Sequence, residues 1–259
     1  FCESTFGVKF PMFTKTQVTG DGAAPLFKQL TAQTGQKPRW NFHKYLIGRD
    51  GKVIASFSSR GPVIDGRIKP EITAQGASVV STGFGSYYTN NGTSMSTPAV
   101  TGGAAILIQR FRQLNNGANP INALVKNLLC NGATDKGNEG PDYTFGFGWM
   151  NLERSLDMLE NNRFASGSVI HGGFALRSIA VPAGQSVLKV MLNWNDPAAS
   201  MVTSRALVND LDLELVTPNG TILLPRILDT TAARVNQVAG VGVDRINNIE
   251  QITLYNPVA

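Results

Sequence analysis

The sequence predicts an α/β protein that ends in a β-sandwich or jelly roll. Residues 95–114 and 120–129 combine apolar side chains with residues that favour helix ends, and they predict two helices. Short apolar stretches separated by turn residues between positions 178 and 224 are typical of a sandwich or jelly roll. With 42% hydrophobic and 16% charged residues among 259, the chain has the composition of a globular protein and not of a disordered one.

The first part of the chain is expected to alternate strands with a helix. Residues 10–18 predict a strand that ends at a glycine-bearing turn. Residues 25–35 predict an amphipathic helix with proline at its start and glycine at its end. Residues 40–47 and 52–57 predict the two strands of a hairpin around a Gly-Arg-Asp-Gly turn.

The later elements are predicted from the same signals. A helix is expected after Asn151, in addition to the two long helices already named. The C-terminal zone changes to short strands with turns such as Pro-Asn-Gly between them. The strands expected there are residues 178–181, 187–192, 211–216 and 221–224.

Composition excludes several function classes. No stretch approaches the ~18 consecutive apolar residues of a membrane-spanning helix. Cys2 and Cys130 are the only cysteines, too few for a disulfide framework or a zinc site. Residues 1–60 hold nine basic and three acidic residues, whereas residues 61–259 hold 14 and 15. This step predicts a boundary near residue 60. Because no run of like charges occurs, the sequence favours neither nucleic acid nor a membrane as partner.

The stretch Gly92–Gly102, GTSMSTPAVTG, places a serine in the first turn of a predicted helix. A helix N-terminus presents free N–H groups and a positive dipole end. A backbone N–H there helps to hold the oxyanion that forms when Ser94 attacks a carbonyl. The alternative is that Ser94 only caps the helix. The eleven-residue pattern decides against it, since the segment resembles the serine motif of the subtilisin-like serine proteases (subtilases), with Ser94 at the nucleophile.

The resemblance to subtilases covers roughly residues 55–259. It implies a subtilisin-like serine endopeptidase that hydrolyses protein or peptide substrates, followed by the C-terminal β-sandwich of some secreted bacterial members. One departure is Ala74-Gln75-Gly76, where the family usually has Ala-Pro-Gly. Besides the serine motif, the stretches that carry the resemblance are residues 55–62, 65–72, 143–151, 192–197, 208–213 and 244–250.

The groups that would activate this serine are missing from the sequence. A protease of this type needs a histidine base, an aspartate that orients it and an asparagine that donates to the oxyanion, and in the family all three precede the serine. His43 is not in the Gly-x-x-His-Gly-Thr setting of the subtilase base, and His171 follows the serine. We therefore expect the chain alone to have little or no protease activity.

Residues 1–57 resemble a different family, the glutathione peroxidases, over the second half of a thioredoxin-like fold. In that family a Trp-Asn pair, here Trp40 and Asn41, polarises the peroxidatic residue, and Cys2 falls close to the resolving cysteine of the thioredoxin-dependent members. The peroxidatic residue lies further upstream in the family and has no counterpart here, so we expect no peroxidase turnover. The stretches that carry this resemblance are residues 6–15, 18–20, 25–27, 40–47 and 49–53.

The two resemblances together predict a chimeric chain. We expect a partial thioredoxin-like segment at residues 1–57, an incomplete subtilisin-like α/β domain at 58–163 and a truncated β-sandwich at 164–259. The leading function is subtilisin-like peptide-bond hydrolysis carried by Ser94. The alternatives are a glutathione- or thioredoxin-dependent peroxidase fragment and a non-catalytic remnant. The subtilase part implies secretion and the peroxidase part a cytoplasmic location, so the sequence assigns no compartment.

Calcium is the one cofactor that the sequence suggests. Asp210 and Asp212 are two residues apart, so on a strand their side chains face the same way, and Asp196 and Asp244 lie in neighbouring motifs. Ca²⁺ prefers such carboxylate oxygens, and subtilases with domains of this kind often bind calcium. The alternative is that these acids are solvated or cap turns.

Overall fold

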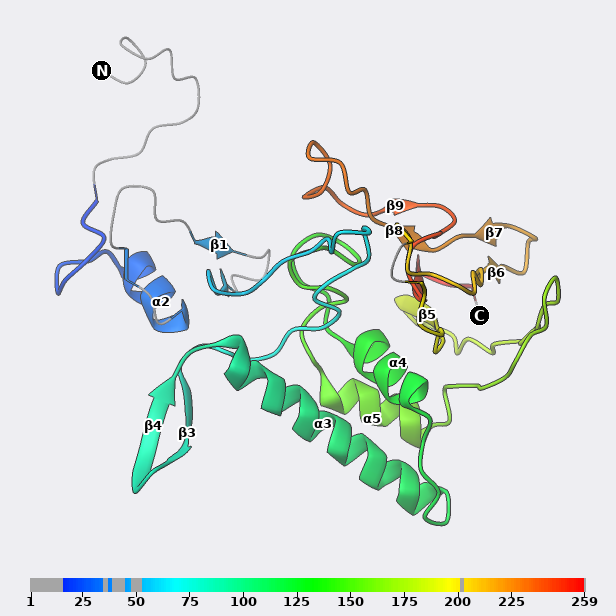
Figure 1. Ribbon diagram of the computed structural model, residues 1–259, viewed down its shortest axis with the longest axis horizontal. Coiled ribbons are helices and arrows are strands. Elements are labelled where there is room, and N and C mark those ends of the chain that lie inside the picture. Colours follow the sequence, from blue (N-terminus) through cyan, green and yellow to red (C-terminus); the bar gives the residue numbers. More distant parts are fainter. Residues whose placement is uncertain (1–15, 35–36, 39–44, 48–52, 201–202, 259) are drawn as a thin grey trace, which may run out of the picture.

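The computed structural model describes residues 16–34, 37–38, 45–47, 53–200 and 203–258 (Figure 1). This part of the chain contains one helix, then four short strands, then three helices, then six strands, and each of the five sheets has two strands. The mixed α and β class expected from the sequence is therefore confirmed. None of the described helices is both long enough and apolar enough to cross a membrane.

The N-terminal elements form a small unit. Helix α2 (Pro25–Thr34) begins at the proline predicted to start it, and the hairpin β1 (Leu46–Ile47) and β2 (Val53–Ile54) is antiparallel as expected. The Phe27 and Tyr45 rings lie 6.5 Å apart between centroids and hold the helix against the hairpin. Most of the strand expected at residues 10–18 lies outside the described residues. The thioredoxin-like arrangement is not confirmed.

Three helices form the centre of the molecule: α3 (Thr93–Leu114), α4 (Asn122–Gly132) and α5 (Leu152–Glu160). All three were expected, with ends within a few residues of the predicted ones. Their apolar faces share one cluster because leucines recur on the facing sides of the helices. Its buried members are Leu107, Leu124, Leu128, Leu129 and Leu159. The hairpin β3 (Val79–Gly83) and β4 (Ser86–Asn90) precedes α3 and projects away from the bundle (Figure 1).

A second core cluster joins segments that are far apart in sequence. It packs Ile68 and Cys130 against the aromatic rings of Tyr143 and Phe147 and against Ile249 near the C-terminus. The Tyr143 hydroxyl donates to the Gly66 carbonyl over 2.8 Å. The middle and C-terminal zones therefore share one core.

The predicted β-sandwich is not confirmed. Strand β5 (Val187–Asn193) pairs over its whole length with β10 (Ile249–Tyr255). The other C-terminal strands have two residues each: β6 (Leu215–Val216), β7 (Ile222–Leu223), β8 (Arg226–Ile227) and β9 (Gly240–Val241). The strand expected at residues 178–181 is wrong, since these residues are unpaired and all but Val181 are exposed. A strand needs a neighbour to accept its backbone hydrogen bonds, and among the described residues none lies beside this segment.

Candidate functional site

Ser94 lies where the sequence placed it, in the first turn of α3. The glycine before the helix, Gly92, donates its N–H to the Gly76 carbonyl over 2.8 Å. A β-carbon at Gly76 would lie 2.9 Å from the Gly92 carbonyl oxygen. The two loop segments can approach this closely only because residue 76 is glycine. The departure from the family pattern at residues 74–76 thus retains the residue that holds the serine turn.

The serine turn is also fixed by side chains. The Ser78 N–H donates to the Asn91 side-chain oxygen over 2.6 Å. The Ser96 and Thr97 hydroxyls both donate to the Thr93 carbonyl, each over 2.9 Å. These contacts use the hydroxyls around Ser94 to close the first turn of the helix.

The Ser94 hydroxyl is different from its neighbours. The residue is exposed, and none of the hydrogen bonds among the described residues involves its side chain. Pro98 lies one turn along α3 and has no N–H to donate to the Ser94 carbonyl. In the first turn of α3, Ser94 thus has an exposed hydroxyl without a hydrogen-bond partner among the described residues.

A base for this hydroxyl is not found among the described residues. His171 is exposed, on the segment between α5 and β5, and no described contact joins it to Ser94. His43 lies outside the described residues. Among the described residues, the Ser94 hydroxyl therefore has no histidine or carboxylate in contact with it that could accept its proton.

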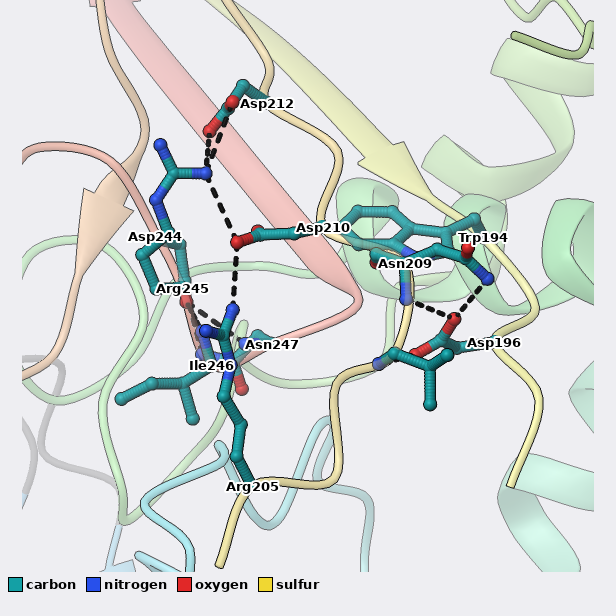
Figure 2. A network of polar contacts seen from close by, with 11 residues as sticks. Trp194, Asp196, Arg205, Asn209, Asp210, Asp212, Asp244, Arg245, Ile246 and Asn247 are labelled. Carbon is teal, nitrogen blue, oxygen red and sulfur yellow. Dashed lines mark hydrogen bonds and ion pairs between the residues drawn. The ribbon is translucent and has the colours of Figure 1, made fainter. Parts of the chain in front are cut away.

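Two of the four aspartates suggested as calcium ligands belong to a charge network (Figure 2). The Arg245 guanidinium lies 3.0 Å from an Asp212 oxygen and 3.2 Å from an Asp210 oxygen. Arg205 also pairs with Asp210, over 2.8 Å. Asp210 and Asp212 lie near each other as predicted, but their carboxylates pair with the guanidinium groups of arginine side chains.

The other two aspartates bind backbone. Asp196 accepts from the N–H groups of Val208 and Asn209, over 2.6 and 2.9 Å. Asp244 accepts from the N–H groups of Ile246 and Asn247, over 2.8 and 3.0 Å. Over the residues that the structure describes, no three His, Cys, Asp or Glu side chains are grouped so as to hold a metal ion. The arrangement fits the alternative of turn-capping acids and does not fit a calcium cluster.

The peroxidase-like residues Cys2, Trp40 and Asn41 lie outside the described residues. The other cysteine, Cys130, is buried in the second core cluster. Burial, helped by the negative charge of Glu71, raises the pKa of the Cys130 thiol to about 12. Because a thiolate is the form that attacks peroxide, Cys130 is no substitute for a peroxidatic cysteine.

Glu250 is a buried charged residue that the sequence analysis did not single out. Only 1% of it is exposed, and one carboxylate oxygen accepts from the Leu213 N–H over 2.7 Å. The other oxygen is buried without a partner. The available signal was a glutamate in a short segment that has isoleucine at both ends, Ile249 and Ile252.

Comparison with known proteins supports both resemblances. Residues 30–148 match the model of the subtilase family. Glutathione peroxidase 7 of Mus musculus is 51% identical over 75 residues, which are 29% of this chain and 39% of that protein. The glutathione peroxidase homolog BsaA of Halalkalibacterium halodurans is 44% identical over 77 residues, 28% of this chain and 47% of that protein. The chain thus spans less than half the length of these curated relatives.

Solved structures of proteases also align with part of the chain. The CspB protease of Clostridium perfringens aligns over 43% of this chain and 25% of that one, with 31% identity and a TM-score of 0.40. The subtilase-model match and the peroxidase relatives show that stretches similar to two families occur in one chain, consistent with a fusion. The boundary at residues 57–58 remains a prediction.

Proposed function

We propose that residues 58–163 are the C-terminal part of a subtilisin-like protease domain in which Ser94 is the nucleophile. The observation that carries this proposal is the unengaged Ser94 hydroxyl in the first turn of α3, inside the segment that matches the subtilase model. Protein or peptide carbonyls are the substrate class that this family implies.

The chemistry assigned to the chain is the first step of acyl transfer. The Ser94 oxygen attacks a carbonyl carbon, and the N–H groups at the start of α3 stabilise the negative charge on the carbonyl oxygen. The hydroxyl proton must pass to a base, and no described residue contacts Ser94 to accept it. We infer that turnover by this chain alone lies well below about 1 s⁻¹, the lower end of ordinary enzyme turnover.

The first prediction separates the nucleophile from its neighbours. Prolonged incubation with a fluorophosphonate, followed by peptide mass spectrometry, is expected to label Ser94 slowly and to leave Ser96 unlabelled. Ser96 is the matched control because its hydroxyl already donates to the Thr93 carbonyl. Ser94→Ala should abolish labelling and Ser96→Ala should preserve it.

Two results would contradict this proposal. Labelling that is equal at Ser94 and Ser96 would remove the special role of Ser94. Robust casein hydrolysis that disappears in Ser94→Ala would overturn the inferred lack of a base.

A second candidate function, thiol-dependent peroxide reduction, is favoured by the identity to glutathione peroxidases. We infer that Cys2, Trp40 and Asn41 are a remnant of that site without its peroxidatic residue. Glutathione- or thioredoxin-dependent consumption of hydrogen peroxide is expected to stay at the background rate. Turnover that is lost in Cys2→Ser would establish the peroxidase instead. Absence of both activities, with no labelling of Ser94, would leave the third alternative, a non-catalytic remnant.

A further inference from the structure

The chain between α5 and β5 is a long exposed linker, residues 165–186. Every residue in it except Val181 is exposed, and it forms an open loop at the right of the view in Figure 1. None of the backbone–backbone hydrogen bonds among the described residues involves residues 174–185. An enzyme can therefore bind the backbone of this linker without first unfolding another element.

Arg177 is the one Asp, Glu, Lys or Arg residue of the linker. It is exposed, and its guanidinium donates to the carbonyl of the preceding residue, Leu176, over 3.0 Å. No ion pair among the described residues includes Arg177. The side chains of Phe174 and Leu176, just before it, are 89% and 76% exposed. The arginine and the residues that precede it are thus accessible to the binding pockets of another protein.

Two other exposed arginines are held more firmly. Arg163 pairs with Asp157 over 2.9 Å. The Arg234 N–H donates to the Thr231 carbonyl over 2.9 Å, and the Arg234 carbonyl accepts from the Gln237 N–H over 2.8 Å. A peptide that binds to another protein in extended form uses its own backbone groups for that contact. The turn at Arg234 must therefore open before an enzyme can bind it, whereas the backbone at Arg177 is already free of such bonds.

The segments before and after the linker are held together by contacts that do not involve it. The Ile68 N–H donates to the Asn247 side-chain oxygen over 2.8 Å, and the Gln251 side-chain amide donates to the Asn131 side-chain oxygen over 3.0 Å. Ile68 and Ile249 both belong to the second core cluster. A break in the linker leaves these hydrogen bonds and this core in place.

We propose that the peptide bond between Arg177 and Ser178 is a processing site for an endopeptidase that cleaves after arginine. The pocket of such an enzyme holds a carboxylate that pairs with the guanidinium, and the linker has no carboxylate of its own to compete with it. Water hydrolyses the bond: its hydroxyl group joins the Arg177 carbonyl carbon, and its hydrogen joins the Ser178 nitrogen. The product is a protein of two pieces, residues 1–177 and 178–259, that stay assembled.

The test is brief digestion of the full native chain with an arginine-specific endopeptidase, followed by mass spectrometry of the intact fragments. The bond after Arg177 is expected to be cut at least about tenfold faster than the bond after Arg234, because the second bond requires local opening. Arg177→Lys keeps the positive charge, and it should make the linker resistant to this enzyme but leave it sensitive to trypsin, which also accepts lysine. Arg234→Lys is the matched control and should leave cutting of the linker unchanged.

Size-exclusion chromatography of the cut chain measures whether the two pieces stay together. We expect them to elute together at the volume of the uncut chain and to separate in urea. Three results would overturn the proposal: cutting after Arg177 that is no faster than after Arg234, unchanged cutting of the linker in Arg177→Lys, or release of residues 178–259 from the cut chain. Circular dichroism verifies that Arg177→Lys folds, and the comparison of the two bonds in the wild type decides without the variant.

Discussion

At the scale of single residues, folding changes the protonation of Glu250. Burial, together with the negative charges of Asp244, Asp212 and Asp210, raises the pKa of its carboxyl to about 8, although the hydrogen bond from the Leu213 N–H opposes the shift. The ordinary pKa of this carboxyl is 4.5. The folded protein therefore holds the Glu250 proton over a range of pH in which the unfolded chain releases it.

This difference predicts how stability depends on pH. Where the folded state binds more protons than the unfolded state, stability falls as pH rises. The contribution of the protonated Glu250 carboxyl to stability is complete below about pH 4.5 and is lost as the pH approaches about 8. We expect the free energy of unfolding to fall by roughly 1–4 kcal/mol between about pH 5 and about pH 8, and Glu250→Gln to remove this fall.

Urea unfolding at several pH values measures the effect. The exposed Glu214 is the control, and Glu214→Gln should keep the pH dependence of the wild type. A flat wild-type profile, or an unchanged slope in Glu250→Gln, would show that Glu250 does not control it.

At the scale of elements, two helical glycines show how packing changes the effect of one substitution. A β-carbon at Gly132, the last residue of α4, would lie 2.6 Å from the Ser155 hydroxyl oxygen. Ser155 is fully buried on α5 and donates to the Leu128 carbonyl over 2.9 Å. At Gly102 of α3, a β-carbon would meet nothing within 4 Å. The first glycine allows two helices to approach, and the second has no such role.

The two glycines therefore give opposite predictions for the same change. Gly132→Ala is expected to lower the free energy of unfolding by about 1–3 kcal/mol, because α4 and α5 must move apart. Gly102→Ala should raise it by up to about 1 kcal/mol, because alanine favours the helix. Chemical unfolding of both variants measures the difference, and two changes of the same sign would contradict this account of the α4–α5 contact.

At the scale of the whole molecule, the C-terminal zone packs onto helix α4. The side-chain amides of Asn127 and Asn193 cross this contact, to the Met191 and Ala123 carbonyls over 3.0 and 2.9 Å. The Lys189 ammonium donates to the Ala133 carbonyl over 3.2 Å. Ile249 of β10 completes the second core cluster. The predicted boundary between residues 163 and 164 is thus crossed by hydrogen bonds and a shared core.

This packing predicts that residues 58–259 unfold together. Ile249→Ala should lower the free energy of unfolding by about 2–5 kcal/mol, since it leaves a cavity in the shared cluster. Val216→Ala, at an exposed position, should change it by less than about 0.5 kcal/mol. Far-ultraviolet circular dichroism follows the helices, and tryptophan fluorescence follows Trp194 when Trp40 and Trp149, the other two tryptophans, are replaced by phenylalanine in every variant compared. Separate transitions in the two signals would mean that the zones fold independently.

The sequence by itself determined the features that depend on neighbouring residues. Helices α2 to α5 follow from apolar spacing, and the position of Ser94 follows from a motif whose loop and helix are contiguous. The matches to subtilases and glutathione peroxidases rest on such contiguous motifs as well. Helix hydrogen bonds join residues four apart, so a short window of sequence holds most of the information.

Only the tertiary structure decided which distant segments meet. The sequence predicted the strand at residues 187–192, but its pairing with β10 depends on the fold around α4. The same holds for Asp210 and Asp212, whose partner Arg245 lies far along the chain, and for the burial of Glu250 beside Leu213. A strand or an acidic side chain accepts many partners with similar energy, and which one it finds depends on the packing of the whole chain.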